Sequence, residues 1–160
     1  MYSKLYGCRS LALRLFSAYG PRMRKDLAMN KLADSTRVDK AIFCARGDAT
    51  QMFRDYTYVE DVAQAFRLAT KFLDKLDSEK GFFKTIDICN GKSQSLKTVI
   101  DALESHLGMY LNCVEYGMPA DWEPASTCGD PIPAKQILGW KPQMEFYEGV
   151  GRFTEWWKSN

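Results

Sequence analysis

Strand-like and helix-like segments alternate along this chain, and their order constrains the fold more than any other feature. Residues 85–89 alternate apolar and polar side chains as a half-buried strand does, and Asn90-Gly91 predicts a turn. Ser95 can cap the helix that follows, whose apolar residues recur at helical spacing as far as Gly108. Segments ordered in this way predict an α/β fold.

The remaining expected elements follow the same order. Residues 11–16 form a nearly continuous apolar run, which predicts a strand buried on both faces and a turn at 17–21. Further strands are expected at 40–45 and 111–116, and helices at 27–33, 59–76, 133–138 and 147–158. The expected apolar face of the helix at 59–76 consists of Val62, Ala63, Phe66, Ala69 and Leu73, and that of the last helix of Val150, Phe153 and Trp157.

Composition excludes several classes of protein. The chain has 160 residues, 46% apolar and 26% charged, as one globular domain has. It lacks both a signal-peptide pattern and the roughly 18 uninterrupted apolar residues of a membrane span, so we expect a cytoplasmic protein with no membrane contact. Residues 1–54 carry eleven basic and four acidic residues, a net of +7, but no nucleic-acid-binding motif accompanies them. We therefore expect no nucleic acid partner.

The cysteines and the histidine indicate no metal or catalytic site. The five cysteines are widely spaced without a C-x-x-C pair, and each has apolar neighbours, which predicts buried, reduced thiols. The only histidine, His106, lies near a helix end and is expected to cap it or to be exposed. The common Gly-rich phosphate loops, H-E-x-x-H and G-x-S-x-G are also absent from the sequence.

The stretch most informative about function is 54–61, Arg54-Asp55-Tyr56-Thr57-Tyr58-Val59-Glu60-Asp61, at the entry to the strongest predicted helix. A guanidinium at this place can bind a phosphate through two hydrogen bonds, and the helix N-terminus adds backbone donors. The alternative interpretation is structural. In it, Asp55 or Asp61 caps the helix and Arg54 pairs with an acidic residue.

Together with residues 13–21, Arg24, Asp26 and residues 137–142, this stretch resembles the extended short-chain dehydrogenase/reductase family. Within that family the chain is most similar to NAD-dependent nucleotide-sugar epimerases of the UDP-glucuronate 4-epimerase type. The likeness runs in order from residue 1 to residue 158 and covers only the C-terminal half of the family's fold. It implies that residues 1–160 are the C-terminal, substrate-binding half of a Rossmann-like epimerase/dehydratase domain, with its small substrate-binding subdomain and without the N-terminal dinucleotide-binding half.

The resemblance also implies which residues bind the nucleotide of a UDP-sugar. Arg54 matches the arginine that holds the diphosphate, and Tyr56 lies beside the same pocket. Ala41 and Phe43 belong to the strand that flanks the uracil base, where backbone groups can bond its edge and Phe43 can pack beside it.

Further roles are implied at the sugar and at the cofactor. Ser17 and Arg24 match the hydroxyl and the cation that face a uronate, and Phe16 would lie near the nicotinamide of NAD. The family's Gly-rich NAD-binding turn and its catalytic Y-x-x-x-K motif do not occur in this sequence, so no catalytic residue is assigned.

Two functional hypotheses follow. The first is a truncated NAD-dependent nucleotide-sugar epimerase that contributes UDP-sugar binding and is inactive as an isolated chain. The second is a non-catalytic interaction module whose exposed sheet edge and apolar face pair with another chain, such as one that supplies the missing half.

Overall fold

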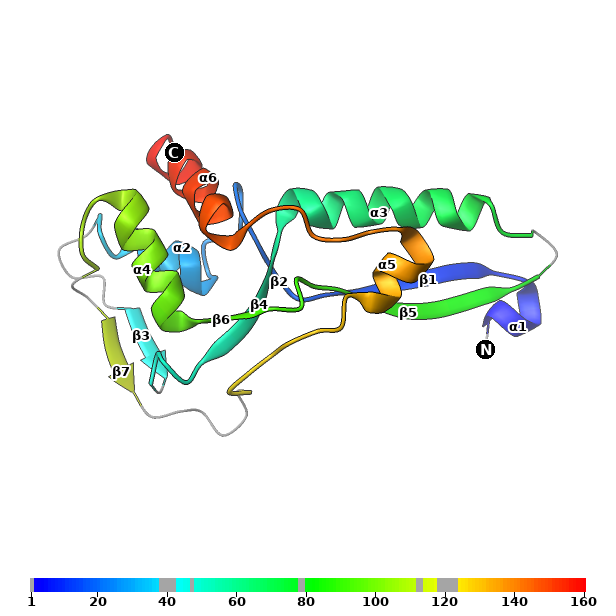
Figure 1. Ribbon diagram of the computed structural model, residues 1–160, viewed down its shortest axis with the longest axis horizontal. Coiled ribbons are helices and arrows are strands. Elements are labelled where there is room, and N and C mark those ends of the chain that lie inside the picture. Colours follow the sequence, from blue (N-terminus) through cyan, green and yellow to red (C-terminus); the bar gives the residue numbers. More distant parts are fainter. Residues whose placement is uncertain (1, 38–42, 47, 78–79, 112–113, 118–123) are drawn as a thin grey trace.

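The computed structural model describes residues 2–37, 43–46, 48–77, 80–111, 114–117 and 124–160, and every structural statement below concerns these residues. It has the expected α/β architecture, with three small sheets and helices packed on them (Figure 1). The elements in chain order are α1 (Tyr2–Tyr6), β1 (Arg9–Leu15), β2 (Ser17–Tyr19), α2 (Ala28–Asp34), β3 (Phe43–Arg46), β4 (Phe53–Tyr58), α3 (Val59–Asp74), β5 (Phe82–Ile88), β6 (Ser93–Ser95), α4 (Leu96–Leu107), β7 (Val114–Gly117), α5 (Ile132–Leu138) and α6 (Phe146–Lys158).

The first sheet pairs β1 and β5 in parallel, with Leu13 opposite Ile86. Helices α3 and α5 contact each other and pack on this sheet (Figure 1). The core between them contains Val62, Ala65, Ala69, Ile86, Ile88, Ala134, Leu138 and Trp140. The strand expected at 11–16 is thus present, but the expectation that it is buried on both faces is wrong. Ser10, Ala12 and Arg14 are exposed, because the packed helices cover only the face that carries Leu11 and Leu13.

The second sheet has the order β2-β4-β6, with β2 parallel and β6 antiparallel to β4. It packs against α2, α4 and α6 around a core that includes Tyr19 and Tyr58. Helix α4 has the expected caps, since the Ser95 hydroxyl accepts a hydrogen bond from the Thr98 amide and Gly108 closes the helix at φ 73°. The expected face of α6, Val150, Phe153 and Trp157, is buried. The third sheet pairs the short strands β3 and β7.

Two local expectations were wrong. Residues 17–19 are not part of a turn but form β2, and the turn begins at Gly20, which has φ 132°, and includes Arg22 at φ 65°. In α3, Phe66 is 50% exposed and Ala63 is exposed, whereas Ala65 and Ala69 are buried. The small side chains of these alanines allow α3 to approach the sheet closely, so the helix presents them rather than Phe66.

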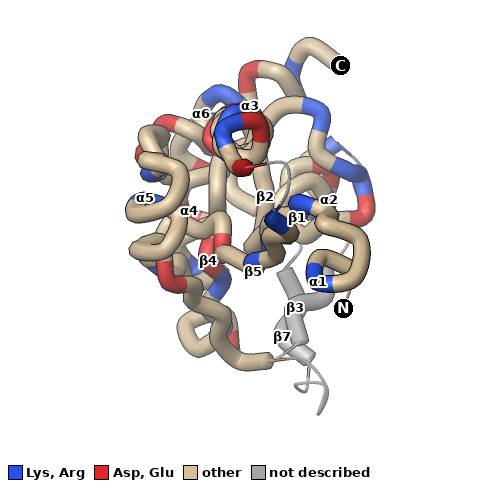
Figure 2. Tube along the Cα trace, turned by 90° about the vertical axis from the view of Figure 1, so that its right-hand side faces the viewer, with Lys and Arg blue, Asp and Glu red and all other residues tan. Residues whose placement is uncertain are grey.

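The cysteines also differ from expectation. Cys89 is buried, but Cys8 and Cys128 are exposed, and the side chains of Cys44 and Cys113 lie outside the described part of the chain. Apolar neighbours in sequence did not bury Cys8, because it lies in the short connection between α1 and β1. Lysine and arginine are interspersed with acidic residues along the trace (Figure 2). Among the described helices, none has the length and apolar character needed to span a membrane.

Candidate functional site

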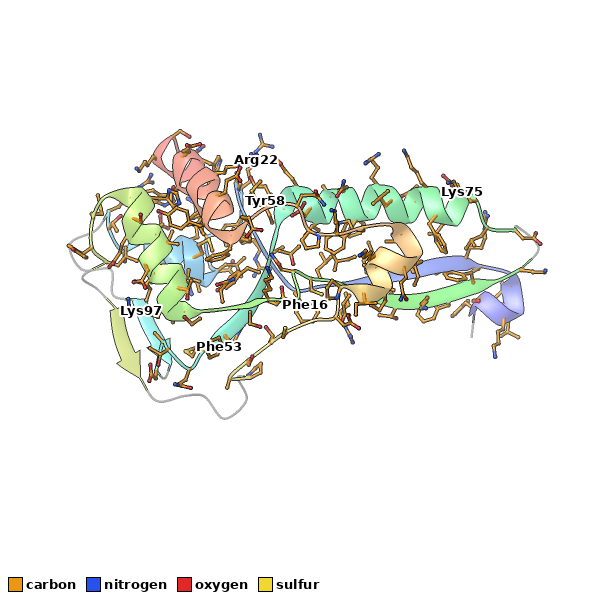
Figure 3. The ribbon with its side chains drawn as sticks, viewed as in Figure 1. Phe16, Arg22, Phe53, Tyr58, Lys75 and Lys97 are labelled. Carbon is orange, nitrogen blue, oxygen red and sulfur yellow. The ribbon has the colours of Figure 1, made fainter. Side chains whose placement is uncertain are left out.

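The site lies where the chain leaves the first sheet and enters the second. The segment from Arg9 to Tyr19 pairs with β5 through β1 and then with β4 through β2, and Phe16 is the residue between the two strands (Figure 3). The Phe16 amide donates a hydrogen bond to the Ile88 carbonyl at 3.2 Å, which continues the β1–β5 ladder by one step. Ligands of open α/β sheets bind outside the carboxyl ends of the parallel strands, and Phe16 directly follows the carboxyl end of β1.

Strand β4 supplies the central side chains. Successive side chains of a strand point to opposite faces, so Arg54 and Tyr56 share one face and Asp55 and Thr57 the other. Ser17 of β2 is the direct partner of Tyr56 and therefore lies on the same face. The structure thus brings together three of the residues expected to bind substrate, Ser17, Arg54 and Tyr56.

The Arg54 side chain is half-buried and held by backbone oxygens. Its Nη1 donates to the carbonyl of Phe53 at 2.8 Å and to that of Ala125 at 3.3 Å. Gln94 of β6 is the direct partner of Arg54, so its amide shares the Arg54 face. Sequence reasoning missed Gln94, because the strand that carries it has only three residues and no apolar alternation.

The capping interpretation of the two aspartates is wrong. Helix α3 begins after Tyr58, which makes no side-chain cap bond. Asp61, in the first turn of α3, accepts hydrogen bonds from the amides of Gln143 and Met144, both at 3.0 Å. Asp55, on β4, accepts from the amides of the turn after β5 and from that of Gly129. Both carboxylates bind loops distant in sequence, and spacing along the chain cannot reveal that.

A strand-like segment runs beside β4 at residues 125–127. The Phe53 amide donates to the Ala125 carbonyl at 2.8 Å, and the Thr127 amide donates to the Phe53 carbonyl at 3.1 Å. The Ser93 hydroxyl donates to the Thr127 carbonyl at 2.7 Å. These bonds bring Ala125, whose carbonyl contacts Arg54, next to the second sheet.

Phe16 packs at the junction of β5 with the segment that follows Thr127. A Cβ added to Gly129 would lie 2.8 Å from Phe16 Cε2 and 2.6 Å from Cys89 Sγ, so the backbone of Gly129 approaches both side chains closely. Burial raises the pKa of the Cys89 thiol to about 12, and the nearby carboxylate of Asp55 adds to the shift. Cys89 is therefore a packed, protonated thiol and not a nucleophile.

Tyr56 belongs partly to the core. Its ring packs against those of Tyr19 and Phe146, with centroids 5.9 and 5.4 Å apart. Burial raises the pKa of the Tyr56 hydroxyl, while Arg54 lowers it to a smaller extent. The phenol therefore stays neutral and can form hydrogen bonds, and it does not act as a base near neutral pH.

Arg24 lies in the loop between β2 and α2, with its side chain 75% exposed. Its guanidinium binds both carboxylate oxygens of Asp26, with Nε 2.9 Å from Oδ1, and this hydrogen bonding holds the pKa of Asp26 at about 2. Arg24 is thus presented in the fork geometry that binds a carboxylate. Ala41 lies outside the described residues. Phe43 is described only as part of the backbone of β3.

The described side chains include no cluster of His, Cys, Asp and Glu that could hold a metal ion. Phe16 is the described residue that the resemblance places near the nicotinamide of NAD, and its ring approaches the Gly129 backbone closely. A ring in this place can line a nicotinamide but cannot bind a pyrophosphate. Phe16 therefore suits only the nicotinamide end of NAD.

Comparison with known proteins gives consistent relatives. The family model for GDP-mannose 4,6 dehydratase matches residues 1–153. A UDP-glucuronate 4-epimerase of Thermodesulfobacterium geofontis is 30% identical over 99% of this chain and 46% of its own length. A probable UDP-glucuronate 4-epimerase of Rhizobium meliloti is 26% identical over 99% of the chain and 49% of its own. The chain spans about half the length of the curated relatives it matches.

The solved structures that this chain resembles belong to the same class of enzyme as its sequence relatives. The UDP-glucuronic acid 4-epimerase of Bacillus cereus, in complex with UDP-glucuronic acid and NAD, superimposes with a TM-score of 0.83 at 26% identity, over 99% of this chain and 48% of that one. The UDP-glucose 4-epimerase of Thermotoga maritima, with UDP-glucose, gives 0.83 at 25% identity over the same shares. The expected Rossmann-like fold of the extended short-chain dehydrogenase/reductase class is confirmed.

Proposed function

Because this chain belongs to the GDP-mannose 4,6 dehydratase family, whose relatives include NAD-dependent UDP-sugar 4-epimerases, we propose that it forms the UDP-sugar-binding half of such an epimerase. The observation that carries the proposal is the shared face of β2 and β4, on which Arg54, Tyr56 and Ser17 are neighbours. This face offers a cation for a diphosphate and two hydroxyls for hydrogen bonds to the nucleotide or the sugar.

In this proposal the residues bind and orient a UDP-sugar. Arg54 binds the diphosphate, and Tyr56 lines the nucleotide pocket with its neutral phenol. Ala41 and Phe43 contact the uracil. Ser17 hydrogen-bonds to the sugar. These groups hold C4 of the sugar in place, which lowers the barrier for a reaction whose catalytic groups lie in the complementary half.

In the complete epimerase of this proposal, the reaction would be oxidation and reduction at C4 of the sugar, and bound NAD would accept the hydride and return it. The chain contributes Phe16 toward the nicotinamide, and its sequence has neither the Gly-rich turn nor the Y-x-x-x-K motif. We therefore propose that the isolated chain binds UDP-sugars without converting them. Spectrophotometry of the purified chain with NAD and a UDP-sugar tests this, and NADH formation would contradict it.

A uronate is the proposed sugar. Arg24 already binds a carboxylate, that of Asp26, and both side chains are exposed. An exposed ion pair of this kind is screened by water and contributes little, so the uronate carboxylate of a ligand can replace Asp26. Arg24→Ala is therefore expected to weaken binding of UDP-glucuronate and to leave that of UDP-glucose unchanged. Equal loss for both ligands would assign Arg24 a role other than uronate recognition.

The complementary half is the proposed partner, either from the same polypeptide or from another chain. The face of β1 and β5 opposite α3 and α5 exposes Ser10, Ala12 and Thr85, together with Phe83, which is 64% exposed. Parallel sheets are normally covered on both faces, so this face supports docking of a second layer. An interaction module without nucleotide binding would use the same face but would not need the Arg54 site.

Titration with UDP separates these functions. Isothermal calorimetry of the chain with UDP is expected to give saturable binding, and Arg54→Ala should weaken it about tenfold to a hundredfold, because a charge-assisted hydrogen bond contributes about 1.5–3 kcal/mol. The matched control is Arg152→Ala, which removes an arginine that pairs with Glu148 on the surface of α6. Absence of UDP binding by the folded chain would overturn the proposed function and favour the interaction module.

A further inference from the structure

The second face of β4 carries a buried carboxylate that the nucleotide site does not use directly. Asp55 is 0% exposed. Its Oδ1 accepts a hydrogen bond from the Asn90 amide at 2.8 Å, and its Oδ2 accepts from the amides of Gly91 at 2.9 Å and Gly129 at 3.2 Å. Three backbone donors from two separate segments thus meet at one side chain.

A carboxylate suits this position better than any neutral side chain. It has two oxygens and about four lone pairs, all acceptors, and hydrogen bonds from backbone amides offset the loss of hydration. An asparagine has the same shape but only one oxygen, and its NH₂ group would face an N–H group instead of accepting from it. Asp55→Asn therefore removes part of the network with little change in volume.

The network continues from Asp55 to Arg54. Gly129, bound to Asp55, lies two residues after Thr127, whose amide donates to the Phe53 carbonyl. The same segment begins at Ala125, whose carbonyl accepts from both the Phe53 amide and Arg54 Nη1. The segment 125–129 is thus attached to β4 at both ends, by Asp55 at one end and next to the guanidinium at the other.

We propose that Asp55 is a positioning residue for Arg54. By holding Gly129 and the turn at Asn90-Gly91, it fixes the segment whose Ala125 carbonyl orients the Arg54 guanidinium, and so it sets the affinity for the diphosphate of a UDP-sugar without touching the ligand. The effect on diphosphate affinity rests on the proposed function of Arg54, whereas the positioning of Arg54 by Asp55 does not.

The first experiment compares two ligands in the 160-residue chain. Asp55→Asn is expected to weaken binding of UDP about tenfold and to leave binding of uridine, which lacks the diphosphate, within about twofold. In the Arg54→Ala background, Asp55→Asn is expected to have no further effect on UDP binding. A purely structural role would weaken both ligands alike, and the two substitutions would then add; either result would overturn the inference.

The matched control is Asp61→Asn. Asp61 is also a buried carboxylate that accepts two backbone hydrogen bonds, but it holds residues 143 and 144, away from Arg54. It should lower stability without changing the ratio of UDP to uridine affinity. If Asp55→Asn does not fold, Ser93→Ala serves instead, because it loosens the same segment by removing only the bond to the Thr127 carbonyl. It should change the ratio in the same direction by a smaller factor, and an unchanged ratio would contradict the inference.

A ligand-free measurement separates failure of the inference from failure of the proposed function. NMR signals of the Arg54 side chain and of the Ala125 carbonyl should shift in Asp55→Asn and not in Asp61→Asn. If they do not shift, Asp55 does not position Arg54, whatever the chain binds. If they shift but wild type binds no UDP, the positioning is supported and the proposed function is wrong.

Discussion

Gly149, in the first turn of α6, gives the sharpest test of how tightly this fold is packed. Alanine normally stabilises a helix by about 0.5–1 kcal/mol relative to glycine. Here, a Cβ at position 149 would lie 2.2 Å from Oη and 2.8 Å from Cζ of Tyr19. Tyr19 is 2% exposed, its ring packs against those of Tyr56, Tyr58 and Phe146, and its hydroxyl donates to the Phe146 carbonyl at 3.3 Å.

The neighbouring rings leave Tyr19 little room to move, so the clash should outweigh the gain in helix propensity. Overpacking costs about 1–3 kcal/mol, and displacement of the Tyr19 hydroxyl costs about 1 kcal/mol more. Gly149→Ala should therefore lower the free energy of unfolding by about 2 kcal/mol, which corresponds to a fall in Tm of roughly 4–8 °C for a chain of this length.

Chemical denaturation monitored by tryptophan fluorescence measures this change, and Tyr19→Phe supplies the control background. Without the Tyr19 hydroxyl the 2.2 Å contact disappears, although the Cζ contact remains. The cost of Gly149→Ala should therefore be smaller by about 1 kcal/mol in this background. A variant Gly149→Ala that is more stable than wild type, or an equal cost in both backgrounds, would refute the reasoning.

Two further predictions concern titrating groups. The pKa of Asp26 is about 2, and in Arg24→Ala it should return toward 3.8, as measured by NMR of the carboxyl carbon. Because the pKa of Asp26 is lower in the folded state, the stabilisation of the fold by this pair is present above pH 3.8 and is lost as the pH falls toward 2. An unchanged pKa would mean that Arg24 is not its main partner. At pH 8, a thiol reagent should modify the exposed Cys8 and Cys128 rapidly and Cys89 only on unfolding. Because the pKa of Cys89 is raised from 9.0 to about 12, its protonated thiol stabilises the folded chain fully below pH 9 and progressively less as the pH rises toward 12. Cys89→Ala should reduce this loss of stability at high pH. An unchanged dependence of stability on pH in the variant would contradict this.

Helices with a local signature were predictable from sequence. Ser95 marks the start of α4 and Gly108 its end, because each residue caps backbone groups within one turn of itself. The face of α6 followed from the spacing of Val150, Phe153 and Trp157. In these cases the deciding interactions are close in sequence, or one side of the helix is far more apolar than the other.

Features that depend on distant partners were not predictable. The aspartates at 55 and 61 occur where helix caps are common, yet their hydrogen-bond partners lie 35 to 83 residues away. Gln94 joins the candidate site only because β6 pairs with β4. Whether Phe66 or Ala65 faces the sheet depends on how closely α3 approaches the sheet. The spacing of apolar residues in the sequence does not decide between these two faces of the helix.

The alternation along β4 has a consequence for how this site can change in evolution. The register of the strand is set by pairing of Phe53 with Ser95 and of Tyr58 with Tyr19, and not by the length of the turn at 48–51 that precedes it. Residues can therefore be gained or lost before Phe53 while Arg54 keeps its direction. With the Phe53–Ser95 pairing kept, one residue inserted between Phe53 and Arg54 would move both following side chains to the opposite face, so that the guanidinium would lie where Asp55 is now buried and the carboxylate would lie on the face that now carries Arg54.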